Sequence, residues 1–67
     1  MRNEETADLA KALNSKYTQW EEGDLTQGEI VDFFDMLLKT RAFPLLNGSR
    51  RRVAFKTAMK LRSNGVL

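Results

Sequence analysis

Residues 25–38 read LTQGEIVDFFDMLL and contain the clearest helix start in the chain. Thr26 and Glu29 have the spacing of a capping box, in which each side chain accepts a hydrogen bond from the backbone N–H of the other residue. Leu25 and Ile30 occupy the two positions of a hydrophobic staple around that cap. The segment therefore predicts an amphipathic helix that begins at about residue 27.

The apolar residues of this helix recur with the i, i+3, i+4, i+7, i+8 spacing of one core-facing side, at Ile30, Phe33, Phe34, Leu37 and Leu38. Pro44 favours extended conformations at the residue before it, Phe43, so the helix should end before that residue. We expect a helix over residues 27–41.

Similar signals on both sides predict two further helices. Asn3 is a good N-cap for a helix over residues 4–22, which Gly23 would end. Ser49 can cap a helix over residues 50–63, which Asn64 and Gly65 would end. No segment alternates apolar and polar residues as a strand does. We expect one all-α, compact three-helix domain over residues 1–67, with a core of Leu9, Leu13, Trp20, Ile30, Phe33, Phe34, Leu37, Val53, Ala58 and Leu61.

The composition excludes several functional classes. The 67 residues include no Cys and no His, which removes disulfides, the commonest metal ligands and the usual general base. We therefore expect neither an enzyme nor a metal or other cofactor. No apolar run approaches the roughly 20 residues that span a bilayer, and no signal peptide follows Met1. The chain is expected to be cytoplasmic, with no membrane partner.

Charge is divided sharply along the chain. Residues 1–38 carry all nine acidic residues and three basic ones, whereas residues 39–67 carry eight basic residues and no acid. The formal net charge of +2 hides this division. Two charge zones in so short a chain point to binding or assembly through charge.

Three arginines break a local rule. Arg50, Arg51 and Arg52 occupy the first turn of the last expected helix, where the helix dipole disfavours cations. Such departures are expected at functional sites. Free backbone donors and three guanidinium groups would together bind an anion, either a carboxylate of a protein partner or a nucleic-acid phosphate. Alternatively, acids such as Glu21 and Glu22 pair with these arginines within the molecule.

Two more features extend this candidate site. Arg52, Lys56 and Lys60 recur every four residues and form a basic stripe, which is either a contact surface or simply a solvated face. Phe43 belongs to an apolar segment, residues 43–46, that is either an exposed contact patch or a cover for the core. Closure of the core is the reading we favour for that segment. The candidate partner-binding residues are Arg50, Arg51, Arg52, Lys56, Lys60 and Phe43.

Several short motifs lie between Trp20 and Gly65, at residues 20–26 (WEEGDLT), 29–30 (EI), 33–35 (FFD), 38–40 (LKT) and 46–48 (LNG). Together they resemble small tailed-phage proteins of uncharacterised function, which combine an acidic helix ending in Thr-Gly, a Leu-Gln-Gly turn and an arginine-containing last helix. Arg41 stands where the pattern has Gly, and Asn47 where it has Gln. The resemblance implies a phage origin and no particular activity.

These observations favour a small non-enzymatic binding module, encoded by a phage, that binds and modulates a host protein in the host cytoplasm. One alternative is a nucleic-acid-binding protein that presents the same basic helix to phosphates. The other is a self-associating structural protein, a homo-oligomer in which the acidic half of one copy meets the basic half of the next.

Overall fold

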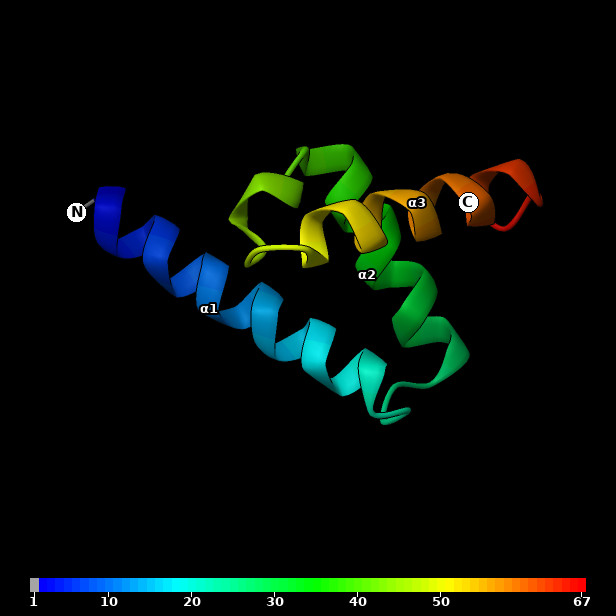
Figure 1. Cartoon of the computed structure of the whole chain (residues 1–67), viewed down its shortest axis with the longest axis horizontal. Helices are drawn as coiled ribbons and strands as arrows, with labels where there is room; N and C mark the ends of the chain where they lie inside the picture. The colour runs from blue at the N-terminus through cyan, green and yellow to red at the C-terminus, as the bar shows by residue number, and fades with distance from the viewer. Residues whose placement is uncertain (1) are drawn as a thin grey trace.

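A computed structural model describes residues 2–67, with side chains from Glu4 onward. The elements run in the order α1 (Arg2–Glu21), α2 (Gln27–Thr40), a 3₁₀ turn η1 (Phe43–Leu45) and α3 (Arg50–Ser63) (Figure 1). The described residues form no strand, so the predicted all-α, three-helix fold is confirmed. None of the described helices has the length and apolarity that a membrane crossing requires.

The capping box of α2 forms as predicted. The Thr26 N–H donates to Glu29 Oε1 over 2.9 Å, and the Glu29 N–H donates to Thr26 Oγ1 over 3.1 Å. The bond from the backbone of Thr26 stabilises the charged carboxylate and so lowers the pKa of Glu29. Each side chain thus satisfies a backbone donor that the helix leaves without an internal partner.

The predicted ends of α1 and α3 are also confirmed. Gly23 and Gly65 have φ angles of 75° and 77°, in the left-handed region that glycine enters without steric cost. The next N–H then turns back onto the helix, from Asp24 to Gln19 O and from Val66 to Leu61 O, both over 2.8 Å. Each bond satisfies a carbonyl of the last turn.

The predicted N-terminal caps of these two helices were wrong or lie outside the described side chains. Ser49 has helical angles (φ −69°, ψ −11°) and makes no side-chain cap bond, because an N-cap needs an extended backbone to aim its oxygen at the first turn. The N–H groups of Arg50 and Arg51 instead donate to the carbonyls of Asn47 and Gly48. Asn3 lies within α1, which begins at Arg2, and its side chain is outside the described part.

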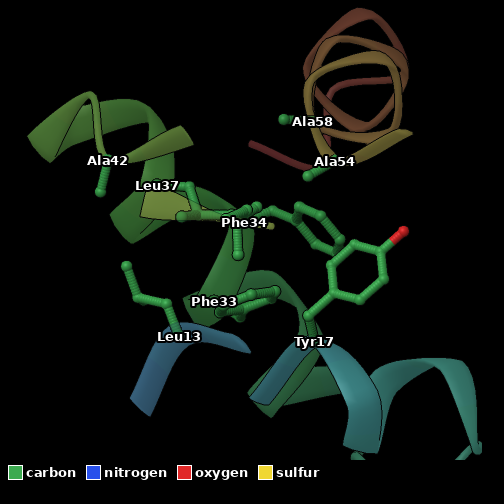
Figure 2. Close-up of a cluster of buried hydrophobic side chains, with 9 residues drawn as sticks. Leu13, Tyr17, Phe33, Phe34, Leu37, Ala42, Ala54 and Ala58 are labelled. Carbon is green, nitrogen blue, oxygen red and sulfur yellow. The ribbon is translucent and has the colours of Figure 1, made fainter. Parts of the chain in front are cut away.

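The core gathers around Phe34, whose ring contacts Trp20 and Phe33 edge-on. Figure 2 shows Ala54 and Ala58 on the side of α3 that faces this ring. Small residues there let α3 approach α2 closely. The buried residues are Leu13, Tyr17, Phe33, Phe34, Leu37, Ala42, Leu46, Ala54 and Ala58.

Part of the predicted core was wrong. Leu9 and Val53 are 45% and 42% exposed. Leu9 belongs to the apolar stripe of α1, but it lies on the N-terminal part of the helix, which extends beyond the other elements (Figure 1). Val53 lies on the outer side of α3. Trp20, Ile30 and Leu61 pack at the edge of the core rather than within it.

The segment after α2 closes the core, as we favoured. Leu46 is fully buried, and Phe43 and Leu45 pack partly against the same cluster. The expected extended conformation of Phe43 was wrong, because this residue opens the 3₁₀ turn. The Leu45 N–H donates to Ala42 O, and the Leu46 N–H donates to Phe43 O. The turn keeps these backbone groups paired while the chain reverses direction.

Arg41 ends α2 in a left-handed conformation, with φ 54° and ψ 43°. A side chain in this region crowds its own backbone at a cost of about 1 kcal/mol or more. We therefore expect Arg41→Gly to raise the free energy of unfolding by about 1 kcal/mol. Urea denaturation monitored by circular dichroism measures this change. Equal or lower stability of the variant would show that the Arg41 side chain compensates for its backbone.

Candidate binding surface

The first arginine of the cluster is directed into the fold rather than to solvent. Arg50 Nη1 donates to Asn14 O over 2.9 Å, and Nη2 donates to Thr18 Oγ1 over 3.1 Å. Nη2 also lies 3.6 Å from Glu21 Oε1. All three partners belong to α1, so one guanidinium group fastens the start of α3 to that helix.

The same guanidinium lies over the ring of Tyr17, with its Cζ 4.7 Å from the ring centroid. The Tyr17 side chain is only 2% exposed. Burial raises the pKa of Tyr17, the nearby charge of Glu21 raises it further, and Arg50 opposes both. Tyr17 therefore stays neutral and presents its ring face to the cation.

Asn14 fastens the loop before α3 to the same helix. Its Nδ2 donates to Leu45 O over 3.0 Å, and its Oδ1 accepts from the Asn47 N–H over 2.9 Å. The backbone around residues 45–50 is thus held against α1 from two sides. The Asn14–Arg50 contacts were not predicted, because no sequence pattern connects residues so far apart.

These contacts correct the predicted anion site. Arg50 contacts groups of its own molecule, including Glu21. The alternative interpretation, internal pairing with acids, therefore applies to this residue. The backbone donors of Arg50 and Arg51 are not free, since the Asn47 and Gly48 carbonyls accept from them. The start of α3 is therefore not an open anion site built from all three arginines.

The remaining predicted cations face outward. Arg51 is exposed, although its Nε donates to Leu46 O over 2.8 Å. Arg52, Lys56 and Lys60 are exposed along one side of α3. Within the described part of the chain these four cations form no ion pair with an acid. Their charge is thus available to a partner.

A groove opens between the end of α2, the 3₁₀ turn and α3. It has a volume of about 520 Å³, and its lining contains no acid among the described residues. Leu38 is half-buried there, and Arg41 and Arg62 are exposed. We call this feature the cationic groove; beside Leu38 it is lined by Arg41, Phe43, Pro44, Phe55, Met59 and Arg62.

Two aromatic rings form one wall of the cationic groove. Phe43 and Phe55 meet edge-on, with centroids 5.4 Å apart and planes at 78°. Phe43 is half-buried, whereas Phe55 remains 50% exposed. Phe55 also lines a second hollow beside Arg51 and Arg52, so it connects the groove to the arginines. The structure thus brings Phe43, in the cationic groove, and Arg51 and Arg52, beside the second hollow, onto adjoining surfaces.

Phe55, Met59, Arg41 and Arg62 were absent from the predicted site. The sequence signal that could have identified Phe55 and Met59 was the width of the apolar arc of α3. This arc is too wide for all of its residues to face the core. Phe55 and Met59 lie at the edge of that arc, next to Arg52. A helix that carries more apolar surface than its neighbours can cover leaves the excess exposed.

A larger hollow of about 680 Å³ lies between the start of α2 and the end of α3. Ile30, Val31, Leu61 and Val66 supply its apolar lining. Among the described residues that line this hollow, Asp32 is the only charged one. It lacks both the aromatic rings and the cations of the cationic groove, so it offers a weaker basis for selecting a partner.

The described residues contain no group of three or more acidic side chains that could hold a metal ion. No protein-family model, no curated protein and no solved structure matches this chain.

Proposed function

We propose that this protein is a non-enzymatic module that binds another protein through the cationic groove and the adjoining Arg51 and Arg52. The observation that carries the proposal is the half-exposed Phe55, which lines both the cationic groove and the hollow beside Arg51 and Arg52. Aromatic and arginine side chains are the residues most often responsible for affinity at protein interfaces. The absence of Cys and His from the sequence supports a role without catalysis.

The resemblance to small tailed-phage proteins supports a more specific form of this proposal. In that form the protein is a phage-encoded accessory factor that binds and modulates a host protein in the host cytoplasm. A partner that fits the groove carries an apolar side chain flanked by carboxylates, because Arg41 and Arg62 are exposed on its lining.

Affinity capture from host lysate tests the proposal, with nuclease-treated and untreated samples run in parallel. We expect one stoichiometric protein that survives nuclease and is lost from Phe55→Ser. Val66→Ser is the matched control, because Val66 is 47% exposed but lies outside the groove. Capture that both variants retain would contradict the proposed surface.

Nucleic-acid binding by the stripe of Arg52, Lys56 and Lys60 is the alternative outcome. All three are exposed on one side of α3, which favours contact with phosphates. Loss of every captured species on nuclease treatment would support that function and overturn the first. Affinity for any duplex would then fall steeply with added salt.

A further inference from the structure

The N-terminal part of α1 extends beyond the rest of the fold at one end of the molecule (Figure 1). Glu5, Asp8, Leu9 and Ala12 are exposed there, and their i, i+3, i+4, i+7 spacing places them on one side of the helix. Leu9 is 45% exposed, and the carboxylates of Glu5 and Asp8 lie beside it on the preceding turn. We call these four residues the acidic arm.

We propose that the cationic groove of one molecule binds the acidic arm of a second copy. The inference rests on the proposed function, since it requires the groove to be a protein-docking surface, and it names an occupant. Leu9 supplies the apolar side chain that the lining of Phe43, Phe55 and Met59 can cover. Glu5 and Asp8 supply the negative charge that Arg41 and Arg62 attract.

The arm cannot reach the groove of its own molecule. α1 is one continuous helix from Arg2 to Glu21, so the arm has no hinge at which to turn back. The helix is fixed in place by Leu13 and Tyr17, which are buried in the core. Only a second copy can therefore present the arm to the groove.

Self-association of this kind competes with any other protein for the same groove. The arm and an outside partner present the same chemistry, an apolar residue beside carboxylates. Because the contact depends on exposed charges, added salt weakens it. The protein would then be least available to its partner at high concentration and low salt.

Charge reversal tests the inference, with the average mass measured by sedimentation equilibrium at about 0.01 M ionic strength. We expect the wild-type mass to exceed the 7.7 kDa of one chain. Asp8→Arg or Arg62→Asp alone should weaken association about tenfold, because each puts like charges together. The double variant Asp8→Arg/Arg62→Asp should restore association, since the pair is again complementary.

Asp24→Arg is the matched control, because Asp24 is an exposed acid outside the arm. It should associate as the wild type does. A wild-type mass of one chain at all concentrations would overturn the inference, as would a double variant that fails to recover.

Failure of the inference is distinguishable from failure of the proposed function. Asp8→Arg leaves the groove intact, so partner capture should persist in this variant while self-association weakens. If the wild type is monomeric and its capture of a partner depends on Phe55, only the proposed arm contact is wrong. If capture of a partner does not depend on Phe55, the proposed binding surface itself is wrong.

Discussion

Leu46→Ala is expected to lower the free energy of unfolding by about 2–5 kcal/mol, the range for leucine truncation at a buried site. Leu46 is fully buried and belongs to the segment between α2 and α3 that closes the core. The segment is also tied to α1, because Asn14 bonds the backbone on both sides of Leu46. The neighbouring backbone is therefore not free to move into the cavity that the truncation leaves, so the loss of stability stays large.

Leu9→Ala is the matched control for this measurement. Leu9 carries the same side chain but is 45% exposed, so its truncation should change stability by less than about 0.5 kcal/mol. Urea denaturation of both variants, at low protein concentration and moderate salt, excludes any contribution from association. Equal losses from the two variants would contradict the core described here. A chain of this length holds only a few kcal/mol, so the urea midpoint of Leu46→Ala should fall close to zero.

Arg50→Ala is expected to lower the free energy of unfolding by about 2 kcal/mol. The charged guanidinium donates two hydrogen bonds to α1 and lies over the Tyr17 ring, and all these contacts disappear together. The ion pair with Glu21 adds little, because that carboxylate is half exposed and the atoms are 3.6 Å apart.

Two other substitutions define what Arg50 does. Arg52→Ala removes an exposed arginine of the same helix turn, and its effect should stay below about 0.5 kcal/mol. Arg50→Lys keeps the charge but loses the planar fork of donors, so its stability should fall between wild type and Arg50→Ala. Thermal unfolding of the three variants gives the order. Indistinguishable stabilities of Arg50→Ala and Arg52→Ala would show that Arg50 does not hold the helices together.

Local signals were sufficient to predict most helix boundaries. The capping box at Thr26 and Glu29 and the glycines at positions 23 and 65 act through backbone groups within a few residues. Their outcome therefore depends little on the rest of the fold. Ser49 failed as a cap because the carbonyls of the preceding loop already accept from the first turn of α3.

The extent of the core was harder to predict. Helical periodicity identifies residues on one side of a helix, but it does not say where along the helix its neighbours end. Leu9 and Leu13 share the apolar stripe of α1, yet only Leu13 is covered. The burial of Leu46 depends on how the chain turns after Arg41, which is a tertiary property.

The arginine cluster shows both the value and the limit of a broken local rule. The three cations at the start of α3 predicted one shared site. The sequence could not assign them separate roles, because the hydrogen-bond partners of Arg50 lie on α1, 36 and 32 positions away in the chain. The structure assigns Arg50 to the fold and leaves Arg51 and Arg52 on the surface beside Phe55.

The central proposal is that the cationic groove binds the acidic arm of a second copy, whereas Arg50 and its partners serve the fold. The most direct test is a series of ¹⁵N–¹H correlation spectra of the full chain, recorded at low salt over increasing concentration. The account predicts shifts in the acidic arm and at Arg41, Phe43, Phe55 and Arg62, with Asn14 and Arg50 unchanged. Spectra that do not depend on concentration, or shifts centred on Ile30 and Val66, would contradict it.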